Sequence, residues 1–251
     1  MSRIVTLTTD FGTAGGYVGE MKAVLHTYAQ DATIVDITHD IPRHDVHYAR
    51  VAVARFWRRF PAGTVHLVVV DPGVGSPRAA LAVTCDGRYL VGPDNGVLSP
   101  ALMDSSAIAV ALRVPDDASA TFHGRHVFAP AAAALARGEP ITALGSPPAD
   151  TPIVHRTPEP VRGPGGVVEG EVVAIDRFGN AITNLTADRV AAVVVGHRTI
   201  PIRRAYADVE IGEALAVVGS GGSIEISVRN DSAARALHLS RGDKVILRAE
   251  S

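Results

Sequence analysis

A glycine-rich turn carries an aspartate at one end and an arginine at the other, directly after the most apolar stretch of the chain. Asp71 opens the segment DPGVGSPR and Arg78 closes it, behind the run 64–70 (TVHLVVV). Glycine lets a backbone approach a ligand without a Cβ in the way. The turn lacks the Lys-Ser/Thr pair of a phosphate loop and the GxGxxG spacing, so we do not assign it to nucleotide phosphates. Asp71 and Arg78 either point into one cleft or form an ion pair that stabilises the loop, and the local sequence leaves both open.

Two histidines and an arginine crowd the start of an alanine-rich segment. The sequence FHGRH places His123 and His126 on either side of Arg125, just before the stretch 127–137 (VFAPAAAALAR). The start of a helix favours anions, and an imidazole can transfer a proton near neutral pH. We therefore treat His123 or His126 as a candidate proton-transfer group, although most loop histidines have no such role.

Two further polar residues stand where predicted strands end. Asp10 follows the run 4–9, and ligands of open α/β sheets bind at the carboxyl ends of strands. A carboxylate there can accept hydrogen bonds from two ribose hydroxyls, but position alone favours a turn or helix-cap aspartate. Asn95 lies in the turn GPDNG, where a structural role is favoured, while its amide could still bind a polar ligand.

A third cluster lies in the last third of the chain, in the segment DRFGN. Phe178 can stack on a planar base, Asn180 can pair with an amide-like edge such as that of adenine, and Asp176 can bind a cationic amine. The alternative is a β-turn with glycine or asparagine at positive φ. Ser220 belongs to a further turn, SGG, that could offer backbone groups to a ligand.

No convincing metal site is present in the sequence. The segment HDIPRHDVH, from His39 to His47, holds several donors, but their spacing is variable and it contains no HExxH or paired-cysteine frame. We favour a loop and helix start there over a metal centre. The single cysteine, Cys85, also excludes a disulfide framework and any CxxC motif.

The elements that must position these residues alternate between strand and helix over the first 145 residues. Alternation of this kind predicts an α/β layer sandwich with a mostly parallel sheet. Asp86-Gly87 between two apolar runs predicts a hairpin with a type I′ turn. The expected strands are 4–9, 32–37, 64–70, 81–85 and 88–91, and the expected helices are 17–28, 48–60 and 127–137.

The composition changes near residue 146, where prolines and glycines become frequent. We predict an α/β domain over 1–148, a Pro/Gly-rich linker over 149–166 and a small β domain over 167–251. Short runs with intervening turns predict a mostly β, barrel-like or sandwich-like domain without a convincing helix. Its expected strands are 167–175, 190–195, 198–202, 214–218, 223–228 and 244–249.

The overall charge and hydropathy exclude several classes of protein. The 251 residues include 24 Lys+Arg and 26 Asp+Glu, which gives a net charge of -2 and no basic field for nucleic acid. With 47% hydrophobic residues the chain has material for a core, and no apolar run reaches membrane-spanning length. A strand-like start in place of a signal peptide predicts a cytoplasmic protein with a small-molecule partner.

Six segments, taken together and in order, carry a family resemblance: TTDFG, ITHDIP, VVVDPGVGS, VGPDNGVL, TFHGRHVFAP and DRFGNAITNL. With them the chain resembles the S-adenosylmethionine hydroxide adenosyltransferases, the adenosine-forming SAM hydrolases related to fluorinases and chlorinases. The resemblance implies attack of water or hydroxide on the ribose 5′ carbon of S-adenosylmethionine, giving adenosine and methionine. It also implies that no cofactor or metal is needed, and that the protein is a homotrimer with sites at the subunit interfaces.

The resemblance further implies roles for individual residues. Catalytic residues of the family match Asp71, Arg78 and His123, and the ribose-binding acid matches Asp10. The substrate's methionine amine and adenine would be bound by Asp176, Phe178 and Asn180, with Ser220 matching a C-terminal serine loop and Asn95 as a further binding residue. Family members usually carry an acid where this chain has His126, and the motif position favours His123 as the catalytic histidine.

Three alternatives of different classes stay open at this point. A halide-dependent, chlorinase-like adenosyl transferase would give a 5′-halogenated nucleoside, although the Arg–His pair in place of a halide pocket favours water. A non-catalytic S-adenosylmethionine or adenosine sensor would bind without turnover. A metal hydrolase built on the segment from His39 to His47 would lose activity in EDTA.

Overall fold

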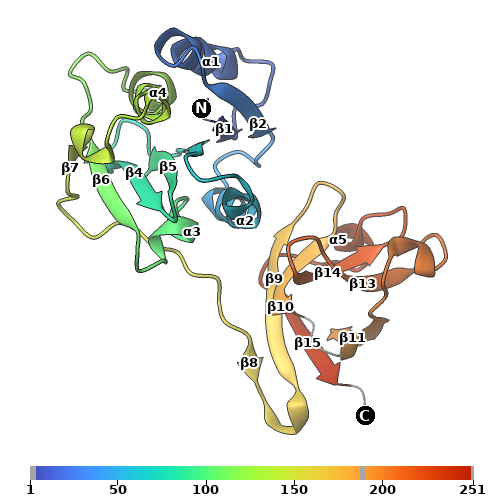
Figure 1. Cartoon of the computed structure of the whole chain (residues 1–251). Helices are drawn as coiled ribbons and strands as arrows, with labels where there is room; N and C mark the ends of the chain where they lie inside the picture. The colour runs from blue at the N-terminus through green and yellow to red at the C-terminus, as the bar shows by residue number, and fades with distance from the viewer. Residues whose placement is uncertain (1–3, 187–189, 250–251) are drawn as a thin grey trace. The chain divides into compact units, whose positions relative to one another are not determined.

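The chain folds into two compact units, each built on its own sheet. The computed structural model describes residues 4–186 and 190–249, and the chain divides between His155 and Arg156. Figure 1 shows most of the helices in the first unit and mostly strands in the second. None of the described helices is both long and apolar enough to cross a bilayer. The domain limits 1–148, 149–166 and 167–251 stay predictions.

The first unit contains a mixed, seven-stranded sheet. Its strands β2, β1, β3 and β5 are mutually parallel, whereas β4, β6 and β7 extend it with antiparallel pairs. In spatial order the strands are β2 (Thr33–Thr38), β1 (Ile4–Thr9), β3 (Val65–Val69), β5 (Arg88–Pro93), β4 (Ala80–Cys85), β6 (Ile108–Leu112) and β7 (Gly145–Ser146).

The expectation of a mostly parallel sheet was therefore wrong, since only part of the sheet is parallel. The reason lies in the hairpin of β4 and β5. Asp86 and Gly87 both adopt left-handed backbone angles, with φ of 51° and 69°, as a type I′ turn requires. This turn reverses the chain and makes β4 antiparallel to β5, and the later strand β6 then pairs with β4 rather than with a parallel neighbour.

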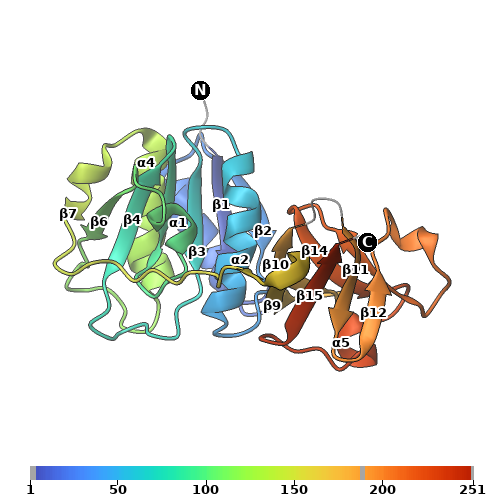
Figure 2. The same cartoon turned by 90° about the horizontal axis from the view of Figure 1, so that it is seen from below.

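Helices cover both faces of this sheet and make a three-layer unit (Figure 1 and Figure 2). On one face α1 (Tyr17–Tyr28) and α4 (Ala129–Arg137) pack with Leu67 of β3. On the other face α2 (Val46–Phe56), the 3₁₀ turn η1 (Trp57–Arg59) and α3 (Ser99–Leu102) pack with Val68. Both side chains are fully buried, which explains why β3 is apolar apart from His66, which is itself fully buried.

The helix boundaries follow local capping. The helix expected at 17–28 is α1, with the same limits. Helix α2 begins at Val46, where the side chain of Asp45 accepts a hydrogen bond from the Tyr48 amide at 2.8 Å, and it ends earlier than expected. A π-helical turn, η2 (Gly124–Phe128), precedes α4, so the helical segment begins three residues before the expected start at 127. His123 is therefore the N-terminal cap of this turn.

The second unit is an antiparallel sheet that nearly closes on itself, in agreement with the barrel-like expectation. A β-bridge between Ile202 and Ala216, with the Arg203 amide donating to the Ala216 carbonyl at 2.8 Å, joins the two ends of the sheet. In spatial order the strands are β12 (Arg198–Pro201), β11 (Val190–Val195), β15 (Lys244–Ala249), β9 (Val168–Ile175), β10 (Ala181–Thr186), β14 (Ser223–Val228) and β13 (Ala214–Val218), with β8 (Val161–Arg162) beside β9.

Among the residues that the structure describes, this unit contains a short α-helix, contrary to the expectation of no convincing helix. Helix α5 (Ala233–Ala236) is capped by the Ser232 side chain, which accepts a hydrogen bond from the Arg235 amide at 3.2 Å. The Ala234 amide donates to the Gly179 carbonyl at 2.8 Å. The helix is thereby fixed against the turn that contains the DRFGN motif.

Candidate active site

Asp71, Arg78 and His123 form one hydrogen-bonded cluster in the first unit. The Arg78 guanidinium donates to both carboxylate oxygens of Asp71, from Nε to Oδ1 at 2.8 Å and from Nη2 to Oδ2. The same Nη2 lies 3.1 Å from Nδ1 of His123. The side chains of Asp71 and Arg78 are 6% and 9% exposed, so water screens this pair only weakly.

The turn that carries Asp71 is held in place from two sides. Asn95 donates from Nδ2 to the Val70 carbonyl at 2.9 Å and accepts from the Val97 amide at 3.2 Å. Gly75 has φ of 78°, and a Cβ at this position would lie 2.6 Å from the Ala120 carbonyl oxygen. This close approach packs the DPGVGS turn against the loop that leads into His123, and it requires glycine.

His123 is neutral near pH 7, with its proton on Nε2. Burial lowers its pKa, the positive charge of Arg78 lowers it further, and Asp71 only partly opposes them. A guanidinium has donors and no acceptor, so the contact with Arg78 requires an unprotonated Nδ1 on His123. The ring therefore offers an Nε2–H donor to whatever lies on its other side.

The cluster borders a small pocket with an aromatic wall. The rings of Phe11, Tyr17 and Phe122 contact one another, with centroids 5.2–5.8 Å apart. The three rings give the pocket an apolar wall beside Asp71 and His123, and Tyr17 in this wall is half exposed. The pocket has a volume of about 160 Å³ and is lined by Phe11, Tyr17, Val69, Asp71, Val74, Thr121, Phe122, His123 and Gly124.

His126 lies outside the cluster. Its Nδ1 accepts a hydrogen bond from the Ser119 amide at 2.9 Å, and its Nε2 lies 3.2 Å from Nε of Arg125. Arg125 in turn pairs with Glu20 of α1. The geometry thus separates the two candidate histidines, because His123 contacts Arg78 whereas His126 stabilises the loop before it.

Asp10 and Asn95 lie near this pocket without lining it. Asp10 ends β1, next to Phe11, and its Oδ2 accepts from the His44 amide at 2.8 Å. Asn95 has both ends of its amide bonded to backbone, which gives it a role in fixing the end of β3. Their contacts with a ligand stay predictions.

In the second unit, Asp176, Phe178 and Asn180 share one tight turn. Oδ1 of Asp176 accepts from the amides of Phe178 and Asn180, and its Oδ2 accepts from the Asn180 side chain, all at 2.9 Å. Phe178 is 71% exposed, whereas Asn180 is buried. Gly179 has φ of 85°, and a Cβ there would meet Oγ of Ser232 at 2.0 Å. The turn therefore presents a bare aromatic ring beside a fixed amide.

This turn forms one wall of a larger pocket of about 790 Å³. Ser220 is not among its lining residues. The sequence analysis missed Tyr206 and the segment 230–235, which come from distant parts of the chain, and also the aromatic wall of the first pocket. The lining residues are Asp176, Arg177, Phe178, Gly179, Asn180, Tyr206, Val228, Asn230, Asp231, Ser232 and Arg235.

The geometry does not support a metal centre in the segment from His39 to His47. Within residues 4–186 and 190–249, no three His, Cys, Asp or Glu side chains come close enough together to hold an ion. His39 instead binds Thr9 through Nδ1 at 2.9 Å.

Comparison with known proteins matches both units. Residues 5–145 match the SAM hydroxide adenosyltransferase N-terminal domain, and residues 170–246 match the C-terminal domain. A Thermus thermophilus protein named (R)-S-adenosyl-L-methionine hydrolase is 41% identical over 98% of this chain and 99% of its own. The protein of the same name from Salinispora arenicola is 37% identical, with 96% of each chain covered.

More distant relatives and solved structures agree with this assignment. A fluorinase from Actinopolyspora mzabensis is 27% identical over 96% of each chain. A conserved protein from Thermotoga maritima has a solved structure with a TM-score of 0.87, 34% identity, and coverage of 97% of this chain and 99% of its own. From the two matched domains and the identity to the hydrolases, the chain belongs to the SAM hydroxide adenosyltransferase family.

Proposed function

We propose that this protein hydrolyses S-adenosyl-L-methionine to adenosine and L-methionine. The observation that carries the proposal is the cluster of Asp71, Arg78 and His123 at an aromatic-walled pocket, in a chain 41% identical to a relative named for this hydrolysis. The name of that relative specifies the (R) form of the substrate, and we extend the same form to this chain.

The substrate explains why such a small set of groups suffices. In the reaction an oxygen–carbon bond forms at C5′ as the carbon–sulfur bond breaks, and the bonding pair leaves with sulfur as neutral methionine. The sulfonium is already an activated leaving group, so we propose that no metal or other cofactor takes part. Attack of an anion on a cation neutralises charge, and it is accelerated where bulk water is excluded and the partners are aligned.

We propose a task for each group of the cluster. The Arg78 charge lowers the pKa of a water molecule bound beside it, so that this water releases a proton to the solvent and attacks as hydroxide. His123 donates a hydrogen bond from Nε2 to the oxygen of this hydroxide, and Asp71 accepts one from its remaining O–H. A lone pair of the hydroxide oxygen is then left for the attack on C5′. Because Nε2 already carries a proton, His123 orients the nucleophile rather than removing its proton.

Product analysis tests the function against its alternatives. Incubation of the protein with S-adenosylmethionine, with and without chloride, should release adenosine and methionine in both cases and at the same rate in EDTA. A 5′-chlorinated nucleoside would instead support the halide-dependent transferase. Tight binding without product would support a sensor, and loss of activity in EDTA would support a metal hydrolase.

We further propose a cytoplasmic homotrimer in which each substrate is bound by the Asp71 cluster of one subunit and the Asp176 turn of its neighbour. The family resemblance implies this arrangement. The first pocket, at about 160 Å³, is also smaller than the roughly 300–1,000 Å³ typical of small-molecule sites, so further walls are needed.

Subunit mixing tests this shared site. Arg78→Ala and Asp176→Ala chains, each inactive alone, should regain activity when they are co-expressed with different tags and purified as mixed oligomers. In a 1:1 mixture about a quarter of the sites would combine two intact halves. Mixed oligomers with no adenosine release would show that both halves come from one chain.

A further inference from the structure

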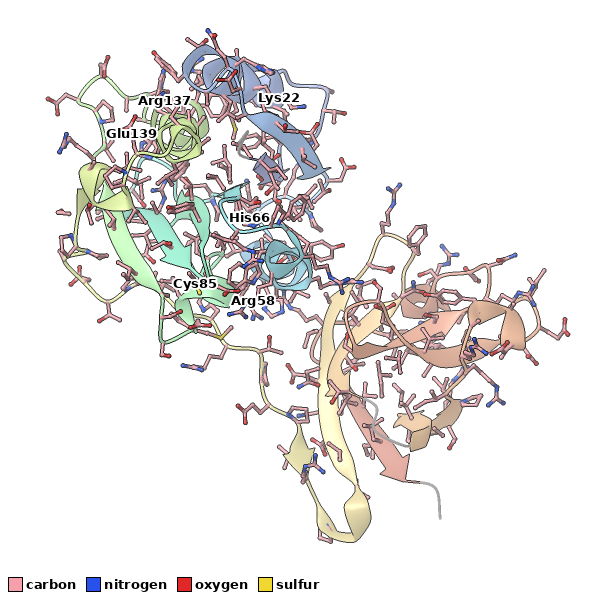
Figure 3. All side chains as sticks on the ribbon, viewed as in Figure 1. Lys22, Arg58, His66, Cys85, Arg137 and Glu139 are labelled. Carbon is pink, nitrogen blue, oxygen red and sulfur yellow. The ribbon has the colours of Figure 1, made fainter. Side chains whose placement is uncertain are left out.

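A set of polar side chains connects β2 to the end of β1, and it is buried at Thr9 and His39. Nδ1 of His39 lies 2.9 Å from Oγ1 of Thr9, and its Nε2 lies 3.1 Å from Oδ1 of Asp36. On the other side, Oδ2 of Asp36 binds Nζ of Lys22 at 2.5 Å, and Lys22, which is labelled in Figure 3, belongs to α1. Thr9 is fully buried and His39 is 6% exposed.

The order acid, imidazole and hydroxyl is that of a hydrolase relay, but this set does not face a substrate. Neither Thr9 nor His39 lines a described pocket, and a hydroxyl with no exposed surface cannot act as a nucleophile on a bound molecule. The set can act only through the groups that Thr9 and His39 hold.

Those groups are the residues on either side of Asp10. The Phe11 amide donates to Oγ1 of Thr9 at 3.3 Å, and the Gly12 amide donates to the His39 carbonyl at 2.8 Å. The carboxylate of Asp10 accepts from the His44 amide at 2.8 Å. The segment 38–44 thus holds both the backbone around Asp10 and its side chain.

His44 supplies a second, independent sign that this segment is built to hold Asp10. Its φ of 63° lies in the left-handed region, which is uncommon for residues other than glycine and costs energy that the surroundings must offset. The strained residue is the one whose amide points at the carboxylate of Asp10.

The charge of Asp36 and the hydrogen bond between His39 and Thr9 follow from their surroundings. Burial raises the pKa of Asp36, but the contacts with Lys22 and His39 outweigh it and keep this carboxyl ionised. Nε2 of His39 lies 3.1 Å from this carboxylate without hydrogen-bond geometry, whereas Nδ1 of His39 and the Thr9 hydroxyl share one hydrogen bond. A lone pair of the Thr9 oxygen remains for the Phe11 amide.

We propose that His39 and Thr9 are positioning residues for Asp10, the acid that the family resemblance matches to ribose binding. With Oδ2 held by His44, the carboxylate keeps Oδ1 for a ribose hydroxyl, and the ribose in turn sets the direction of C5′. Misplacement by about 1 Å far from the reacting atoms can cost as much as 10²-fold in rate. This inference rests on the proposed function.

Matched substitutions separate the two contacts of His39. The asparagine amide reaches where Nδ1 lies and the glutamine amide where Nε2 lies, so His39→Asn keeps the bond to Thr9 and His39→Gln loses it. We expect His39→Gln to lower kcat/KM for S-adenosylmethionine about tenfold, the size of effect expected when the hydrogen bond from the ribose to the charged Asp10 carboxylate is weakened. His39→Asn should stay near wild type, as should His26→Gln, a control at an exposed histidine of α1.

Substrate analogues then show whether the effect passes through Asp10. The loss in His39→Gln should disappear with the 2′-deoxy or the 3′-deoxy analogue of S-adenosylmethionine, whichever lacks the hydroxyl that Asp10 binds. Thr9→Val should show the same loss with S-adenosylmethionine and the same lack of loss with that analogue, whereas Thr9→Ser should keep the wild-type kcat/KM. These two variants keep the test decisive if His39→Gln fails to fold.

Two results would overturn the inference. One is wild-type kcat/KM in both His39→Gln and Thr9→Val, and the other is an equal loss with S-adenosylmethionine and both analogues, which would indicate a general structural role. If the wild-type protein itself releases no adenosine, the proposed function fails. The same variants are then compared with the wild type by their affinity for adenosine, measured by calorimetry.

Discussion

Replacing Arg78 with alanine is expected to lower kcat for adenosine release by about 10³-fold, while the substrate still binds. The substitution removes both hydrogen bonds that hold the Asp71 carboxylate and the one that fixes Nδ1 of His123. It also removes the charge that stabilises hydroxide. Steady-state rates measure the loss in kcat, and calorimetric titration with S-adenosylmethionine measures the remaining affinity.

Two comparisons sharpen this prediction. Arg78→Lys keeps the positive charge but cannot form the paired bonds to Asp71 and the bond to His123 together, so it should recover only a small part of the rate. Arg137→Ala removes an exposed arginine at the end of α4 that pairs with Glu139 (Figure 3), and it should leave the rate unchanged. Full activity in Arg78→Ala would contradict the role assigned to this guanidinium.

The same substitution at the two histidines should have opposite outcomes. In His123→Asn the amide can still accept from Arg78 where Nδ1 was, but the Nε2 donor is gone, and we expect kcat to fall by about 10²-fold. In His126→Asn the amide oxygen can still accept from the Ser119 amide, so the loop and the rate should be kept. Equal losses, or a larger loss at His126, would reverse the assignment.

The pH dependence of the wild-type rate carries the second part of this prediction. The pKa of His123 is lowered by burial and by Arg78, so the neutral ring persists as the pH falls past the ordinary histidine value of about 6.5. Below the lowered pKa, protonation of Nδ1 breaks the contact with Arg78, and the rate should decline. This acidic limb should be missing from the kcat profile of His123→Asn.

Local sequence patterns predicted the elements well where packing and capping agreed with them. Helix α1 and the strands β11, β13 and β14 have the expected limits, because apolar spacing and turn residues mark both of their ends. The sheet order in the first unit was not predictable in this way. The turn at Asp86-Gly87 was predicted, but its consequence for the neighbouring strands depends on which edge β6 joins.

The candidate site was only partly accessible from the residues alone. The DPGVGSPR turn places Asp71 and Arg78 together, and the family resemblance suggested His123, but only the fold shows that His123 contacts Arg78 whereas His126 binds Ser119. The lining of the second pocket joins a turn near 178 with Tyr206 and with the segment 230–235. Contacts over such sequence distances leave no local pattern.

The most direct test of the central claim is to follow the oxygen atom. Hydrolysis of S-adenosylmethionine in ¹⁸O-labelled water should place one labelled oxygen on the 5′ carbon of adenosine, with inversion at a stereospecifically deuterated C5′ and with unlabelled methionine. Adenosine without the label, or label appearing only in the methionine product, would show that the Asp71, Arg78 and His123 cluster does not deliver water to that carbon.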